Sequence, residues 1–300
     1  MEENNCVYVS SRGILKSTKI HSKIPCSSIR HLKDYEFNIN DIVPNTTIYI
    51  CSSAMQHFLN SVMSHLNNQF ILVSGDCDEV CPNDIFVSNE QLYSFLNNPK
   101  LIHWFCQNNI IKHPKITTIP IGIDYHTIYQ NNNHSWGKSI SPISQEQQLI
   151  NIPKKPFYER QIKCYSNFHF LMTTRFGSDR KQAYKMIPSE LVFYEPIKIE
   201  RYQSWLNQSL YAFVISPHGN GMDCHRTWEA LILGCIPIVK KSPIDILYED
   251  LPVLILNEWK DLTLELLTNT VEQFKHKQFN MEKLKLNYWI NLIEKYYVNV

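Results

Sequence analysis

The chain has 300 residues and a mass of 35.3 kDa; 44% of its residues are hydrophobic and 12% are aromatic. This content suffices for two packed domains and excludes a largely disordered chain. Twenty-nine basic and 28 acidic side chains leave a net charge of +1. Such a balance gives no broad field for nucleic acid or an anionic membrane, so a phosphate site would have to be local.

The start of the chain, residues 1–5, is polar and acidic and lacks the apolar core of a signal peptide. No segment approaches the roughly 18 apolar residues of a membrane span, so we expect a soluble protein of the cytoplasm. The nine cysteines are scattered without the pattern of a small disulfide-bonded domain, which predicts reduced thiols.

The first half alternates β-rich runs with helical stretches. Strands are expected at 7–9, 47–51, 70–73, 101–105 and 116–120, and helices at 55–66 and 91–96. This alternation predicts a mainly parallel sheet, in which ligands bind beyond the carboxyl ends of the strands. The polar segments at expected strand ends are 52–53, 74–78, 107–108 and 122–124.

Residues 129–156 are rich in Asn, Ser, Gln and Pro, which predicts a long loop and linker. We place the boundary near residue 155, between domains 1–155 and 156–300. The second half repeats the alternation, with strands at 164–172, 191–194, 211–215, 236–239 and 253–256, helices at 180–186 and 200–206, and a last amphipathic helix at 268–297.

The most informative segment covers residues 216–239. It predicts a strand end, a polar loop with Gly219 and Gly221, a helix with Asp223 as its N-cap, and a buried strand. The amides of such a loop and the positive end of the helix suit a phosphate.

On this helix, His225, Arg226 and Glu229 can face one cleft because one turn separates Glu229 from the other two. Arg226 can hold a diphosphate, and Glu229 can accept hydrogen bonds from ribose hydroxyls. His218 or His225 can add a donor to phosphate, and Ser216 a hydroxyl. The alternative is a surface ion pair of Arg226 and Glu229, with glycines that only turn the chain.

The segment resembles the donor half of exostosin-like glycosyltransferases, where a Ser-Pro-x-Gly-x-Gly loop precedes Arg-x-x-Glu-Ala and Gly-Cys-Ile-Pro-Ile. The resemblance is clear over about 160–260 and looser at 104–108 and 119–124. It implies a GT-B-like α/β fold, two Rossmann-like, doubly wound domains facing a cleft, with the nucleotide sugar on the C-terminal domain and the last helix crossing back to the N-terminal one. It also implies inversion at the anomeric carbon and no metal. Without an N-terminal membrane helix, a viral or microbial source fits best.

Two roles remain to be filled. Arg175 and Arg180 flank the start of an expected helix, where the resemblance implies a second basic contact to phosphate; either could instead be a solvated charge. The acceptor proton needs a base, for which we predict Asp76 or Asp78 after one expected strand, with Asp124 after another. The alternative for Asp76 and Asp78 is that they form turns and cap helices.

Residue types also fit two rival metal sites. Cys77, Cys81, His103 and Cys106 have residue types of a structural zinc site, and Asp76-x-Asp78 is similar to the metal-binding motif of the other large glycosyltransferase fold. No Walker-type loop is present.

We therefore predict a glycosyltransferase that needs no cofactor and moves a sugar from a nucleotide donor, with uridine as the expected base, to a glycan hydroxyl. The alternative is a non-catalytic nucleotide- or glycan-binding module. The sequence names neither the sugar nor the oligomeric state.

Overall fold

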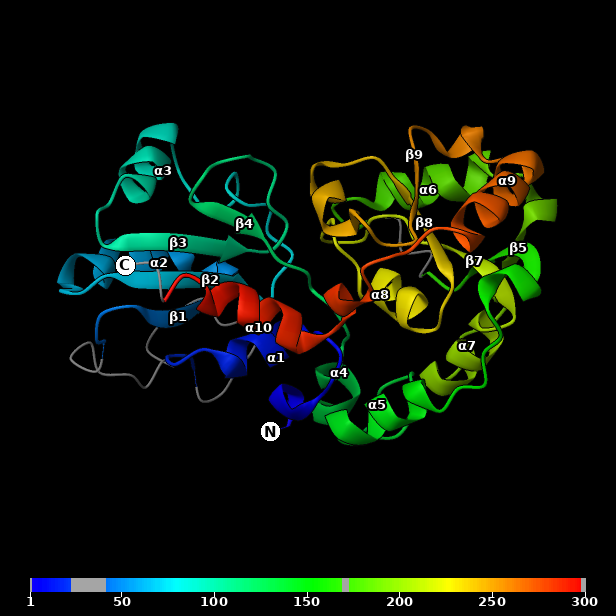
Figure 1. Ribbon diagram of the computed structural model, residues 1–300, viewed down its shortest axis with the longest axis horizontal. Coiled ribbons are helices and arrows are strands. Elements are labelled where there is room, and N and C mark those ends of the chain that lie inside the picture. Colours follow the sequence, from blue (N-terminus) through cyan, green and yellow to red (C-terminus); the bar gives the residue numbers. More distant parts are fainter. Residues whose placement is uncertain (1, 23–41, 169–172, 298–300) are drawn as a thin grey trace.

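The computed structural model describes residues 2–22, 42–168 and 173–297, which form two α/β lobes (Figure 1). Each lobe is built on a sheet whose strands pair in parallel. The strand order is β1-β2-β3-β4 in the first sheet and β6-β5-β7-β8-β9 in the second. The molecule thus has the two Rossmann-like domains that the alternation predicted.

The first sheet closely follows the predicted strands. It contains β1 (Thr46–Cys51), β2 (Phe70–Gly75), β3 (Leu101–Cys106) and β4 (Ile116–Thr118), connected in part by α2 (Met55–Ser61) and α3 (Asn89–Leu96). All residues of β1 and β2 are buried, as in a parallel sheet covered on both faces. The expected strand at 7–9 is wrong: Tyr8 forms only an isolated antiparallel bridge with Lys285, and the unpredicted helix α1 (Ser11–Ser17) follows.

The second sheet contains the reversal of strand order that positions a ligand. It consists of β5 (Gln161–Ser166), β6 (Val192–Tyr194), β7 (Tyr211–Ile215), β8 (Ile236–Lys240) and β9 (Leu254–Leu256), with α6 (Gly177–Met186), α7 (Arg201–Gln208), α8 (His225–Ile232) and α9 (Leu264–Lys275). β6 and β7 lie on opposite sides of β5, and open α/β sheets bind ligands at such a switch point. The end of the expected strand at 164–172 lies in part outside the described residues.

The expected linker at 129–156 is wrong in its structure. It holds the end of α4 (His126–Gln130) and all of α5 (Pro142–Ile150), and α5 packs against α7. Buried Gln145 and Glu146 explain the misleading polar composition, because distant backbone groups bind them: Gln145 donates to the carbonyl of Tyr125, and Glu146 accepts from the amides of Val7 and Tyr8.

The expected single helix at 268–297 is also wrong. The chain forms α9 and then α10 (Leu286–Glu294), separated by an irregular segment. α10 lies against α1, beside the first lobe (Figure 1), and the Tyr297 hydroxyl donates to Thr47 Oγ1 at the start of β1. One apolar cluster includes Val73, Phe105 and Trp228, so the two lobes share packed core residues.

Candidate functional site

A cavity of about 520 Å³ lies between the two lobes, a volume suited to a small organic ligand. Its walls include residues 166–168 after β5, residues 219–221 after β7, the start of α8 and residues 195–199 before α7. Asp78 and Ile121 contribute from the first lobe. The cavity therefore opens at the switch point of the second sheet, where the topology predicts a ligand.

Gly219 and Gly221 allow close approach rather than an unusual backbone angle, since neither has a positive φ. A Cβ on Gly219 would lie 2.7 Å from Nη2 of Arg180, and one on Gly221 would lie 3.0 Å from Oδ1 of Asp78. The alternative that these glycines only turn the chain is wrong, because both admit charged side chains to the loop.

The amides of this loop are partly occupied. The His218 N–H donates to Asp179 Oδ2 at 2.9 Å, and the Gly219 N–H donates to the carbonyl of Gly221 at 3.0 Å. These two amides do not face a phosphate as expected, because they close the loop on itself and onto α6.

The N-cap prediction at Asp223 is wrong. Cys224 occupies that position and makes no side-chain capping bond. Asp223 is instead buried and accepts from the Ile121 amide at 2.8 Å and from Nε1 of Trp228 at 2.9 Å, joining the two lobes. Helix α8 consequently begins at the cavity with its positive end uncapped.

Arg180 and Arg226 bring two positive charges to this end of the cavity. Arg226 donates through Nη2 to the carbonyl of Pro217 at 2.7 Å and lies over the Phe168 ring, while its Nε is buried without a partner among the described residues. Burial, followed by the Arg226 charge, lowers the pKa of Arg180. Two neighbouring guanidinium groups, one of which has a buried Nε without a partner among the described residues, are suited to an anion.

Glu229 lines the cavity, but the predicted alternative of an ion pair with Arg226 is wrong. Its Oε1 accepts from Nε of Arg201 at 3.1 Å and also from Nη2, and both side chains are largely buried. Arg201 further donates to the carbonyl of Asp124 and to Oε1 of Gln145. Sequence reasoning missed Arg201, because no motif marks the first residue of α7.

His225 lines the cavity, whereas His218 and Ser216 are not among its walls. Nδ1 of His218 lies 2.7 Å from the carbonyl oxygen of Met222. Ser216 is buried, with its hydroxyl 2.8 Å from that of Thr227. The structure therefore does not bring these two predicted phosphate donors to the cavity.

Arg175 is another predicted phosphate contact that lies elsewhere. Its guanidinium forms a two-pronged ion pair with Asp84 of the first lobe, and it is not part of the cavity wall. Since the side chain is held by this carboxylate, only Arg180 of the two candidates reaches the site.

Asp76 lies outside the cavity, turned into the first lobe by a backbone φ of 56°. It is buried, accepts from the Ser11 hydroxyl at 3.0 Å and pairs with Nε of Arg12 at 3.3 Å. The prediction of Asp76 as a catalytic base is corrected, because its carboxylate is neutralised and removed from the ligand space.

The Asp124 carboxylate is also occupied by neighbouring groups of the first lobe. It accepts from the Thr127 amide at 2.9 Å and lies 3.2 Å from Nδ1 of His126. Burial alone would raise the pKa of Asp124, but the neighbouring His126, His225 and Arg201 outweigh it and hold that pKa below its ordinary range. Asp124 is not on the cavity wall, so the structure does not bring this predicted base to the ligand space.

Asp78 alone of the three predicted bases lines the cavity. Its Oδ2 accepts from Nδ2 of Asn220 at 2.8 Å, so it reaches across to the glycine loop of the second lobe. It therefore lies beside the cationic end of the cavity, close to Arg180.

The predicted zinc residues do not converge. The thiol of Cys77 lies 2.9 Å from that of Cys51, and Cys81 lies 3.1 Å from Cys106, while Nε2 of His103 contacts the hydroxyl of Thr117 at 2.8 Å. Within residues 2–22, 42–168 and 173–297, no group of three or more His, Cys, Asp and Glu side chains is arranged to hold a metal ion.

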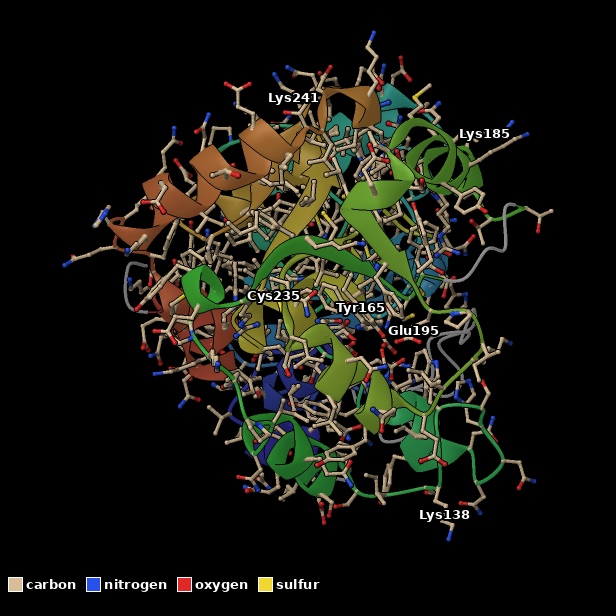
Figure 2. All side chains as sticks on the ribbon, turned by 90° about the vertical axis from the view of Figure 1, so that its right-hand side faces the viewer. Lys138, Tyr165, Lys185, Glu195, Cys235 and Lys241 are labelled. Carbon is tan, nitrogen blue, oxygen red and sulfur yellow. The ribbon has the colours of Figure 1, made fainter. Side chains whose placement is uncertain are left out.

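Sequence reasoning missed a polar network around Glu195, which also lines the cavity. Oε1 of Glu195 accepts from the Tyr165 hydroxyl at 2.8 Å and from Nδ2 of Asn207 at 2.6 Å. Figure 2 shows Tyr165 and Glu195 side by side near the middle of the second lobe. Trp136 adds aromatic surface to the wall, whereas Phe168 lies against Arg226.

No protein-family model matches the chain, and no curated protein matches it. Among solved structures, it is similar to an α,α-trehalose-phosphate synthase (UDP-forming) from Burkholderia vietnamiensis, with a TM-score of 0.45 and 9% identity over 87% of this chain and 74% of that one. It is also similar to an α1,3-fucosyltransferase, with a TM-score of 0.44 and 10% identity over 98% of this chain and 96% of that one.

In the described part of the chain, no helix combines the length and the apolar character that crossing a bilayer requires.

Proposed function

We propose that this protein transfers a sugar from a nucleotide diphosphate sugar, with UDP as the nucleotide, to the hydroxyl of a glycan. The observation that carries the proposal is Arg226, whose buried Nε has no partner among the described residues and which stands beside Arg180 at the uncapped start of α8. A diphosphate would supply the missing acceptors.

The same groups fit the chemistry of the leaving group. When the bond between sugar and phosphate breaks, negative charge grows on the diphosphate, and fixed positive groups in a dry cavity stabilise it. Arg180 and Arg226 would fill this role, so the proposed reaction uses no metal.

The ribose would be held further along α8. Glu229 is a cavity residue whose carboxylate is fixed by Arg201, so it is oriented before a ligand arrives and can accept from ribose hydroxyls. Trp136 offers an aromatic face to the planar base. The resemblance to exostosin-like enzymes adds the nucleotide sugar as donor class and inversion at the anomeric carbon.

A non-catalytic module that binds a nucleotide or glycan is the second candidate. It is favoured by the placement of Asp76 and Asp124 outside the cavity, which leaves Asp78 as the one predicted base that reaches it. This candidate has the same nucleotide site but no turnover.

The test is a thermal-shift titration with UDP, GDP, CMP and a panel of UDP-sugars, with and without EDTA, because a ligand of the folded state raises Tm by mass action. We expect UDP and at least one UDP-sugar to stabilise the protein equally in EDTA, and Arg226→Ala to abolish the shift. Lys185→Ala, at an exposed lysine that points outward in Figure 2, is the matched loss of charge and should keep it.

Release of UDP from the stabilising donor then separates the two candidates. Turnover supports the transferase, and binding without turnover supports the module. Absence of a shift with every nucleotide would contradict both nucleotide-binding proposals.

A further inference from the structure

His225 is a cavity residue whose imidazole is anchored through one nitrogen. It is the first residue of α8, is half-buried, and lines the wall that faces the first lobe. Its Nδ1 lies 2.7 Å from the carbonyl oxygen of Gly122. Among the described residues, Nε2 of His225 has no hydrogen bond, so the second nitrogen is available to a ligand.

The anchor fixes the tautomer. A carbonyl oxygen can only accept, so Nδ1 carries the proton and neutral Nε2 presents a lone pair. The anchor is also rigid, because the Ser11 amide donates to Ile121 and the Ile123 amide to Val9, each at 2.8 Å. Gly122 itself has a φ of 65°, and a Cβ there would lie 2.1 Å from the Val9 carbonyl oxygen.

This geometry differs from the phosphate-donor role that the sequence predicted for His225. A neutral ring held at Nδ1 has no N–H left at Nε2 and cannot donate to phosphate. Arg180 and Arg226 already supply donors at the cationic end. Acidic and basic groups both face or flank the imidazole. The His126 ring lies 6.3 Å away. The other groups are Asp124, Asp223, Arg226 and the ion pair of Glu229 with Arg201.

The predicted carboxylate bases are less well placed. Asp76 is paired with Arg12, Asp124 accepts from the Thr127 amide, and both lie outside the cavity. Asp78 reaches the cavity, but its Oδ2 accepts from Nδ2 of Asn220. Nε2 of His225, by contrast, has no hydrogen bond among the described residues.

We propose that His225 is the general base of the transfer, an inference that rests on the proposed function. Nε2 takes the proton of the acceptor hydroxyl as its oxygen bonds to the anomeric carbon. The bond between that carbon and the phosphate oxygen breaks, and its electron pair leaves on the diphosphate. The imidazolium then releases the proton to water, which regenerates the neutral imidazole.

The experiment compares His225→Asn with wild type. Asparagine can retain the donor to the Gly122 carbonyl but has no counterpart of Nε2. The matched control is His218→Asn, since His218 is anchored by a carbonyl in the same way but lies outside the cavity. UDP affinity is measured by calorimetry, and UDP release from the donor that gives the largest thermal shift is followed between pH 5.5 and 8.5 with water or methyl glycosides as acceptor.

We expect His225→Asn to bind UDP within about twofold of wild type and to release it about 100-fold more slowly, the usual loss on removing a general base. A general base acts in its unprotonated form, so wild-type turnover should fall as the pH is lowered, and the variant should lose this dependence. His218→Asn should behave as wild type.

Three results would overturn the inference. Turnover of His225→Asn within threefold of wild type places the base elsewhere, and a tenfold loss of UDP affinity makes His225 a phosphate contact. A wild-type protein that binds UDP without turning over any donor is a binding module, and one that binds no nucleotide refutes the proposed function itself. If His225→Asn does not fold, ¹⁵N NMR of histidine-labelled wild type decides, since a proton on Nε2 at pH 8 contradicts the base.

Discussion

The two lobes contribute unequally to the cavity between them. The second lobe presents Arg180, Arg226 and the uncapped start of α8, and Arg226 retains a buried donor without a partner among the described residues. The first lobe has carboxylates at the matching strand ends, but Asp76 and Asp124 are bound by other side chains. Residue type at a strand end therefore predicts proximity to a site, whereas the partners of that residue decide whether it can act there.

Arg201 contacts both lobes, so its removal is expected to have the largest effect on stability. Arg201→Ala leaves the Glu229 carboxylate buried without its counter-charge and removes donors to the Asp124 carbonyl and to Gln145. We expect a loss of about 4–5 kcal/mol in the free energy of unfolding, the upper range for breaking a buried ion pair. Urea denaturation measures it.

The partner variant Glu229→Gln provides the control. The double variant has no buried charge left. Its loss of stability should therefore be smaller than the sum of the losses of the two single variants. A loss below about 1 kcal/mol for Arg201→Ala would show that neither the ion pair with Glu229 nor the contacts of Arg201 with the first lobe stabilise the fold appreciably.

Asp76 and Asp78 are separated by one residue and were equal candidates in the sequence. Asp76→Asn leaves Arg12 buried without its carboxylate, and Nη1 of Arg12 already lacks a partner among the described residues. We expect it to cost about 3 kcal/mol of stability, while exposed Asp78 should change stability by about 0.5 kcal/mol or less as Asn.

Thermal unfolding of the two variants, with UDP affinity as a second readout, distinguishes them. Neither change should weaken UDP binding more than about twofold, since neither side chain is a proposed donor contact. Equal destabilisation by both would contradict the division between a structural and a cavity-lining aspartate.

The sequence predicted the second sheet and the motif helix well because their signals are local. Strand β7 has the predicted bounds, and Arg226 and Glu229 reach the cavity from one helix face. Arg201 and Glu195 could not be found in this way, since their partners lie 28 and 30 residues away in the chain. Helix α5 was missed for the same reason: Glu146 is buried through amides 138 and 139 residues distant.

A pH experiment probes how the end of the chain docks on the first sheet. Burial, followed by His113 and Lys115, lowers the pKa of His103 to about 4, and its ring lies 4.0 Å from that of Tyr296. Below the ordinary histidine value of about 6.5, the unfolded chain takes up a proton that the folded chain does not. The contribution of neutral His103 to the free energy of unfolding is therefore fully present above pH 6.5 and is lost as the pH falls toward 4.

Between pH 7 and pH 4.5 this difference is about 2 kcal/mol of unfolding free energy. His103→Gln, which can keep a hydrogen bond with Thr117, should reduce the loss on acidification by that amount. Denaturation midpoints of both proteins at the two pH values measure it, and parallel losses would mean that other groups cause the acid sensitivity.

The smallest expected effect concerns the glycine loop. A Cβ at Gly219 meets the far end of the flexible Arg180 side chain, so Gly219→Ala should move the guanidinium and leave stability within about 0.5 kcal/mol of wild type. We expect UDP to bind about fivefold more weakly, or about 1 kcal/mol. Gly122→Ala is the contrasting variant, since it strains a positive φ and meets backbone, and it should unfold the protein more readily. Unchanged UDP affinity in Gly219→Ala would show that Arg180 does not need its position against the loop to serve the ligand.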